Sequence, residues 1–120
     1  MDPSKTAARD ANCIFCKIID RQIPSNIVTE DETCIAIRDV NPQGPTHILI
    51  LPKNHVANIT EVKDPQLLGS LFMKVGEIAK SEKLDQGFRT VVNTGEHGGQ
   101  TVDHLHIHVI GGRHLEWPPG

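Results

Sequence analysis

The sequence is poor in aromatic residues. They make up 3% of its 120 residues, as three Phe and one Trp with no Tyr. Proteins that bind single-stranded nucleic acid stack the bases on aromatic side chains, so surfaces of that class are essentially missing. Basic residues are not in excess either, because 12 Lys and Arg stand against 15 Asp and Glu, which gives a formal net charge of -3. We therefore expect no nucleic-acid polymer as a partner.

Long apolar runs are also missing. No run approaches the roughly 18 residues that a membrane span needs, and the N-terminus lacks the apolar middle of a signal peptide. We expect no membrane association and a cytoplasmic protein, with the nucleus as a second location. Cysteines number only three. Cys13 and Cys16 have the Cys-x-x-Cys spacing of a metal or redox site, and Cys34 is expected to be a small buried hydrophobe.

The length and the hydrophobic pattern predict a single α+β domain at residues 13–120, after a disordered tail at residues 1–12. A long helix should begin at Asp64 and Pro65, lose its apolar stripe at Leu84 and end at Gly87. The other expected elements are a short helix at residues 13–19 and strands at 26–29, 33–40, 46–51, 88–93 and 104–110. This order predicts an antiparallel sheet of about five strands, with a homodimer to cover its free edge.

Residues 104–110 alternate strictly between histidine and apolar side chains. On a strand, His104, His106 and His108 would form one exposed ridge while the apolar residues face the core. Near neutral pH, histidine can be a nucleophile, a general base or a metal ligand, so a plain metal site is the alternative to catalysis. His97 and His114 are expected to be solvated loop residues.

A glycine-rich loop precedes this histidine segment. Gly95, Gly98 and Gly99 are expected to turn their backbone N–H groups toward an anion, since they have no side chains to obstruct it. Gln100 and Thr101 would add an amide and a hydroxyl at the mouth of that concavity. His47 would join the site if its strand neighbours the histidine strand.

These residues carry a resemblance to a known family. His104-Leu105-His106-Ile107-His108-Val109-Ile110 resembles the signature of the histidine triad (HIT) family, in which three histidines alternate with apolar residues. The ending Trp117-Pro118-Pro119-Gly120 is similar to that of the Hint branch. Further matching stretches lie at residues 14–19, 45–47, 51–55, 98–101 and 111–113. The resemblance covers about residues 13–120 and implies an α+β homodimer with the HIT-like fold.

The resemblance also implies an activity, the hydrolysis of nucleoside 5′-phosphoramidates such as AMP joined through nitrogen to an amine. His106 would be the nucleophile that becomes adenylylated, while His108 and His47 hold the phosphate and manage protons. Other roles that it implies are contacts to phosphate and leaving group from Thr101, Gln100, Asn93 and Gly99, and contacts to the nucleoside from Asp39 and Val40. From the residues alone, Asp39 reads equally well as a turn cap. Catalysis would require no cofactor.

A structural zinc is a further implication of the resemblance. In many family members two cysteines join two histidines around zinc, and the corresponding residues here are Cys13, Cys16, His55 and His104. Such a Cys₂His₂ set leaves no open position for catalysis, and His104 would then be a ligand rather than a catalytic group. The alternative is that both cysteines pack in the apolar face of the short helix.

Two other functions stay open at this point. One is hydrolysis of dinucleoside polyphosphates, as in the Fhit branch, and the other is a nucleotide-binding adaptor with signalling proteins as partners. The pair Ile37-Arg38 stands where the family often has Phe-His before the ribose carboxylate. The resemblance implies a purine nucleoside as substrate, and this pair departs from the family's pattern at the position that bears on stacking of the base.

Overall fold

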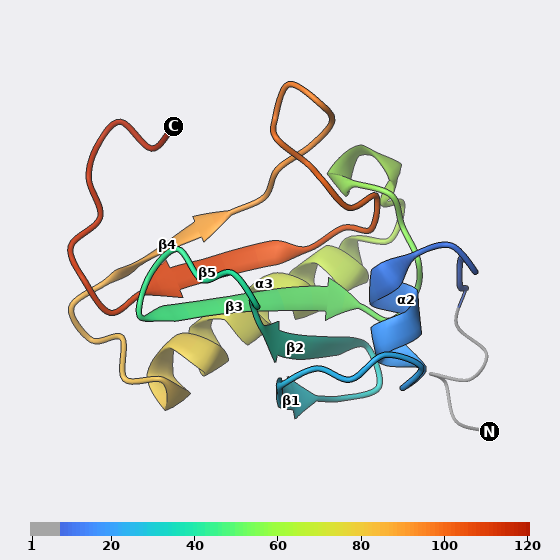
Figure 1. The fold of residues 1–120 in the computed structure, drawn as a ribbon, viewed down its shortest axis with the longest axis horizontal. Helices are drawn as coiled ribbons and strands as arrows, with labels where there is room; N and C mark the ends of the chain where they lie inside the picture. The colour runs from blue at the N-terminus through green and yellow to red at the C-terminus, as the bar shows by residue number, and fades with distance from the viewer. Residues whose placement is uncertain (1–7) are drawn as a thin grey trace.

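The computed structural model describes residues 8–120 of the chain. Its elements are α2 (Ile14–Ile19), β1 (Ile27–Glu30), β2 (Cys34–Arg38), β3 (Thr46–Pro52), the 3-10 helix η1 (Ile59–Glu61), α3 (Pro65–Ser81), β4 (Phe88–Val91) and β5 (Ile107–Gly111). The strands form one antiparallel sheet in the order β1-β2-β3-β5-β4, with α3 lying across one face (Figure 1). The predicted α+β architecture is confirmed.

Strand β3 lies in the centre of the sheet, as its nearly continuous apolar run predicts. Its side chains alternate between the two faces. Ile48 and Ile50 belong to the core that contains α3, whereas Leu49 and Leu51 pack with α2 on the opposite face. All four are buried. Each face of the sheet therefore has its own apolar cluster, and α2 covers the face that carries the histidines.

The ends of α3 show which helix signals were reliable. Its start is as predicted, because the Asp64 side chain accepts a hydrogen bond from the backbone N–H of Gln66 (2.9 Å) directly before Pro65. Its end is not at Gly87. The helix stops at Ser81, and Lys83 takes the left-handed conformation (φ 58°). No helix of the described part is long and apolar enough to cross a membrane.

The first seven residues of the predicted tail lie outside the described residues, but the next few contact the domain. The Ala8 backbone N–H donates to Asn54 Oδ1 (2.7 Å), and the His55 N–H donates to the Ala8 carbonyl (2.8 Å). Arg9 pairs with Asp20 at 3.0 Å. The prediction of a tail up to residue 12 was therefore wrong at its boundary, because hydrogen bonds hold a polar segment that has no hydrophobic pattern.

Strand β5 begins three residues later than predicted, at Ile107. The preceding residues run beside the loop after β3, where the Leu105 N–H donates to the Val56 carbonyl (2.7 Å). Within the sheet, His108 lies opposite Leu49 and His47 lies opposite Ile110. This register places His47 and His108 as neighbours on one face.

Candidate active site

The histidines of residues 104–108 are not an exposed ridge. His104 is fully buried, His106 is 6% exposed, and only His108 is partly open. The ring of Phe15, on α2, stands edge-on against both His104 and His106, with ring centroids 5.8 and 5.1 Å apart. The prediction of an exposed ridge was wrong because α2 packs over this end of the sheet.

His106 has one free ring nitrogen with a lone pair. Its Nδ1 lies 2.7 Å from the His104 carbonyl oxygen. A carbonyl can only accept, so Nδ1 carries the proton and Nε2 of the neutral ring does not. Burial lowers the pKa of His106 and so favours the neutral ring at pH 7. A neutral imidazole with an unprotonated Nε2 has the form that nucleophilic attack requires, and the orientation of this ring is set by a main-chain atom.

His47 and His108 form a hydrogen-bonded pair. The backbone N–H of Gln43 donates to His47 Nδ1 (3.0 Å), and His47 Nε2 lies 2.9 Å from His108 Nδ1. The proton of neutral His47 is therefore on Nε2, and that of neutral His108 is also on Nε2. This atom of His108 is buried and makes no hydrogen bond within the described part of the chain. The rings of His106 and His108 are 4.9 Å apart between centroids, so the ring with an unprotonated Nε2 is the direct neighbour of the ring with an unused N–H donor.

Burial also sets the charge of this pair. It lowers the pKa of His108 to about 4 and lowers that of His47, where the Asp39 carboxylate partly opposes the shift. Asp39 Oδ2 is 3.4 Å from His47 Nε2, while its Oδ1 accepts from the backbone N–H of Asn41 (2.8 Å). The turn-cap role of Asp39 is confirmed by that second contact. Its role toward a ribose stays a prediction.

A hollow of about 320 Å³ opens beside the His47–His108 pair. Asn93 lines it, together with Arg89 and Arg113. None of the described residues in its lining is acidic. Sequence reasoning missed Arg89, Arg113 and the Gln43 backbone, because no local pattern indicates which main-chain donor will contact a histidine or which distant cation will line the same hollow.

The glycine-rich loop does not present the predicted anion cradle. The N–H of Gly95 donates to Gln100 Oε1 (2.9 Å), that of Gly98 to the Gly95 carbonyl (3.2 Å) and that of Gly99 to the Glu96 carbonyl (3.0 Å). All three donors are therefore used inside the loop. The Gln100 amide is used as well, since its Nε2 donates to the carbonyls of Ala57 and Val102. In this structure the loop is a closed turn that Gln100 anchors.

Two other predicted site residues lie apart from the histidine pair. Thr101 is exposed and lines a separate hollow of about 350 Å³, together with Cys13 and His55. Val40 is 97% exposed, directly after Asp39. Among the described residues, no hydrogen bond or ion pair assigns a role to either side chain, so both roles stay predictions.

The four predicted metal ligands converge. The Nδ1 atom of His104 is 3.3 Å from Cys13 Sγ, 3.6 Å from Cys16 Sγ and 3.2 Å from His55 Nδ1. Cys16 Sγ is 3.4 Å from His55 Nδ1, and all four ligand atoms lie within 4.8 Å of one another. Zinc–sulfur bonds of about 2.3 Å and zinc–nitrogen bonds of about 2.0–2.1 Å place tetrahedral ligands roughly 3.3–3.8 Å apart. The donor set therefore fits a tetrahedral zinc ion.

The surroundings of the cluster suit a metal too. His104 Nε2 lies 2.8 Å from the Pro52 carbonyl, which leaves its Nδ1 unprotonated toward the other ligands. Cys16 Sγ accepts from the Asp10 backbone N–H at 3.4 Å, so the N-terminal segment closes over the cluster. Burial raises the pKa of the Cys16 thiol to about 11, so without a metal the thiol stays protonated near neutral pH, and a bound cation would stabilise its thiolate.

Ile37 and Arg38, the pair that departs from the family's pattern, have their side chains on opposite faces of the sheet. Ile37 is buried against α2, whereas Arg38 pairs with Glu82 at the end of α3 (2.8 Å). Arg38 therefore points away from the histidine face. Of the two residues, only Ile37 contributes a side chain to the face that carries the histidines.

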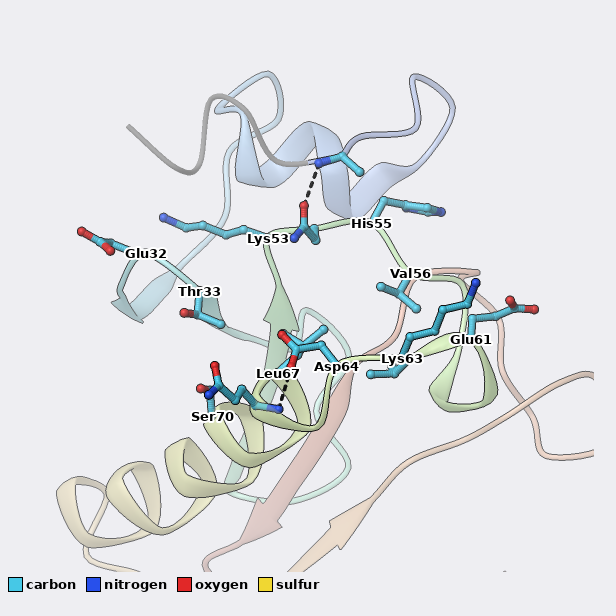
Figure 2. Close-up of a pocket in the computed structure, with 14 residues that line it drawn as sticks. Glu32, Thr33, Lys53, His55, Val56, Glu61, Lys63, Asp64, Leu67 and Ser70 are labelled. Atoms are coloured by element: carbon cyan, nitrogen blue, oxygen red, sulfur yellow. Dashed lines mark hydrogen bonds between the residues drawn. The ribbon is translucent and has the colours of Figure 1, made fainter. Parts of the chain in front are cut away.

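A larger hollow, of about 720 Å³, lies elsewhere. Figure 2 shows it between the loop after β3 and the N-terminal end of α3. Its lining carries both charges, from Glu32, Glu61 and Asp64 as well as from Lys53 and Lys63. His55 is its only histidine among the described residues, so this hollow is not the candidate active site.

Comparisons with known proteins agree with this geometry. Residues 20–115 match the sequence model of the HIT domain. An uncharacterized HIT-like protein of Synechococcus elongatus is 57% identical over 109 residues, which cover 89% of this chain and 96% of that protein. A solved HIT family hydrolase from Legionella pneumophila is 46% identical with a TM-score of 0.89, and the match covers 91% of this chain and all of that one. A histidine triad nucleotide-binding protein from Candida albicans is 32% identical with a TM-score of 0.79, over 91% of this chain and 85% of that one. Cys13 and Cys16 lie outside the matched domain range.

Proposed function

Because the chain belongs to the HIT family, we propose that it is a hydrolase of nucleoside 5′-phosphoramidates, similar to the Hint branch, that releases AMP from AMP–amine conjugates. The observation that carries the proposal is the pairing of His106, whose Nε2 has a free lone pair, with His108, whose buried Nε2–H has no partner. A nucleophile beside a hydrogen-bond donor is what attack at a phosphoryl centre requires. The relatives named as a hydrolase and as a nucleotide-binding protein support this choice.

The reaction has two steps. His106 Nε2 attacks the phosphorus and the P–N bond breaks, so that the amine leaves with the electron pair of that bond and takes one proton from solvent. A water molecule then attacks the His106-bound phosphorus, which frees Nε2, releases AMP and returns one proton to solvent. His108 donates its Nε2–H to a phosphoryl oxygen in both steps, where negative charge develops.

In the bound substrate, the nucleoside would extend from the phosphoryl group at His106 and His108 to one side, and the leaving amine to the other. We assign the ribose hydroxyls to Asp39, whose Oδ2 faces the pair, and the exposed side of the nucleoside to Val40. Asn93 lies in the hollow beside His108 and would bind a phosphoryl oxygen. Thr101, with its exposed hydroxyl, and Gly99 and Gln100 of the anchored loop would border the leaving amine.

The test is turnover of an adenosine 5′-phosphoramidate of an alkyl amine, alongside a dinucleoside polyphosphate. The wild-type protein should release AMP from the phosphoramidate, and its intact mass should show one adenylyl group during turnover. His106→Asn should lower kcat by about 10⁴-fold or more. His114→Asn changes an exposed histidine outside the site and serves as the control. Turnover by the His106 variant, or faster cleavage of the polyphosphate, would contradict the proposal.

We also propose that Cys13, Cys16, His55 and His104 hold a structural zinc. The ligand spacing supports this, as does the Pro52 carbonyl that orients His104. The zinc would tie α2 to the segment that carries the triad, and it would take no part in the phosphoryl transfer. Metal analysis of protein purified without affinity tags should find one zinc per chain, and Cys16→Ser should lose it.

A homodimer is the third proposal. Strand β4 is an edge strand with no partner on its outer side within the described sheet. Phe72, Met73 and Phe88 are exposed by 45, 70 and 40%, and large apolar side chains on α3 and β4 are typical of a covered surface. Light scattering after size exclusion should give twice the chain mass, and Met73→Glu should shift it to one chain mass.

A further inference from the structure

The turn before β3 is clamped to the turn after β5. The guanidinium of Arg113 donates from Nη2 to the Gln43 carbonyl (2.8 Å) and from Nη1 to the His114 carbonyl (3.0 Å). Two glycines let the turns approach closely. A Cβ on Gly44 would lie 3.0 Å from the Ile110 side chain, and one on Gly112 would lie 2.8 Å from Pro45 Cβ. The position of Gln43 is therefore set by the chain after β5.

Gln43 is the residue that sets the proton positions in the histidine pair. Its carbonyl accepts from Arg113 and its N–H donates to His47 Nδ1. While that N–H points at Nδ1, His47 cannot carry a proton there, so its proton stays on Nε2 and is donated to His108 Nδ1. The proton of His108 is then on the Nε2 atom that lacks a partner.

We propose that Arg113 is a positioning residue which, by holding Gln43 against His47, fixes the proton positions of His47 and His108 so that His108 presents an N–H to the substrate phosphate. Without the clamp, the Gln43 N–H is released from His47. His47 then has two states of similar energy, and in one of them His108 offers a lone pair instead of a donor. A lone pair facing a phosphoryl oxygen would repel it. The catalytic part of this inference rests on the proposed function, whereas the proton positions do not.

Charge alone is the competing explanation for any effect of Arg113. The charged residues around the histidine pair are Asp39, whose carboxylate is 3.4 Å from His47 Nε2, and Arg89 and Arg113, which line the hollow. Arg89 donates to the Glu116 carbonyl (2.7 Å), and no hydrogen bond to Gln43 is found for it in the described structure. Arg89→Met therefore removes the same charge from the same hollow and keeps the clamp. It is the matched control for Arg113→Met.

The first measurement is independent of turnover. Nitrogen-15 NMR of histidine-labelled protein separates a protonated from an unprotonated ring nitrogen, with His47 and His108 assigned from single His→Gln variants. The wild-type protein and Arg89→Met should both show His47 unprotonated at Nδ1. Arg113→Met should show a mixture of the two ring forms, and Arg113→Lys, which keeps one donor, should lie between them. An unchanged His47 signal in folded Arg113→Met would overturn the proposal.

The second measurement is the kinetic one. Arg113→Met should lower kcat on the AMP–alkylamine by about tenfold, the effect of losing one well-placed hydrogen bond, with KM within about twofold of wild type. Arg113→Lys should recover part of kcat. Equal losses in Arg89→Met and Arg113→Met would assign the effect to charge and refute the clamp. If the wild-type protein turns over no phosphoramidate, the proposed function fails, and the NMR result still decides the proton positions.

Discussion

Gly112, in the turn after β5, offers a quantitative test of the packing beside the site. We expect Gly112→Ala to destabilise the protein for two separable reasons. The residue has a φ of 93°, a conformation that L side chains rarely adopt, and its new Cβ would lie 2.8 Å from Pro45 Cβ and 3.2 Å from Pro45 Cγ. The Pro45 ring is rigid, so it cannot rotate away and the backbone must move instead.

The two contributions can be given magnitudes. Placing a Cβ at positive φ costs about 1–2 kcal/mol, and overpacking a tight contact costs about 1–3 kcal/mol more. Gly87 provides the reference for the first contribution. Its φ of 117° lies even further outside the left-handed well, and a Cβ there would meet nothing within 4 Å. Gly87→Ala should therefore show backbone strain alone, and Gly112→Ala should exceed it by about 2 kcal/mol in the free energy of unfolding.

Urea unfolding followed by circular dichroism measures this difference. With a slope of about 2 kcal/mol per molar urea, Gly112→Ala should unfold at roughly 1 M less urea than Gly87→Ala. In a Pro45→Gly background the contact no longer exists, so Gly112→Ala should there cost no more than Gly87→Ala. Equal unfolding midpoints for the two single variants would refute the close approach. The position of Gln43, which depends on that approach, would then need another explanation.

The remaining predictions concern charge and metal. Burial lowers the pKa of His108 to about 4 in the folded protein, so the unfolded chain takes up a proton at a higher pH than the folded one. The folded state therefore keeps its full stability above about pH 6.5 and loses part of it as the pH falls toward 4. Melting temperatures from pH 7 to pH 4 should therefore fall less steeply for His108→Gln than for wild type, and parallel curves would contradict the assignment. A strong chelator should lower the melting temperature of wild type but not that of Cys16→Ser, since only the wild type has all four ligands. Arg38→His should leave the ratio of adenosine to guanosine substrate turnover unchanged, because Arg38 pairs with Glu82 on the opposite face of the sheet. A changed ratio would show that residue 38 reaches the base.

The secondary structure was largely predictable where one local signal acted alone. Asp64 followed by Pro65 defines the start of α3, because a capping carboxylate and a residue without an N–H suit only a first turn. The end of α3 was missed because the left-handed position is taken by Lys83, not by a glycine. Hydrogen bonds from Lys83 N to the Lys80 carbonyl (3.2 Å) and from Leu84 N to the Ala79 carbonyl (2.9 Å) close the helix, and burial of Leu84 stabilises that turn.

The site was predictable in its residue types but not in its contacts. The alternation of residues 104–108 predicted three histidines on one face of a strand with similar surroundings. In the structure, His104 contacts two cysteines, whereas His108 contacts His47. His47 precedes His108 by 61 positions in the sequence, and Cys13 precedes His104 by 91. No local pattern can contain such pairs. The prediction of an anion site at the glycine-rich loop was wrong because of local contacts rather than distant ones. Its N–H groups were free to bind an anion in principle, but nearby carbonyls and Gln100 satisfy them first.

The orienting partners of three buried histidines have one property in common. His106 is held by the His104 carbonyl, His104 by the Pro52 carbonyl, and His47 by the Gln43 N–H. All three partners are main-chain atoms, so exchanging the side chain at residue 104, 52 or 43 does not remove them. The one exception is proline at residue 43, which would remove the N–H. Tautomer choice in this protein is thus buffered against side-chain exchange at the partner residues themselves and depends on backbone placement. The imidazoles therefore keep their direction as long as the flanking turns keep their place, whereas insertions, deletions or loss of the Arg113 clamp, which move those turns, are the changes that this arrangement cannot absorb.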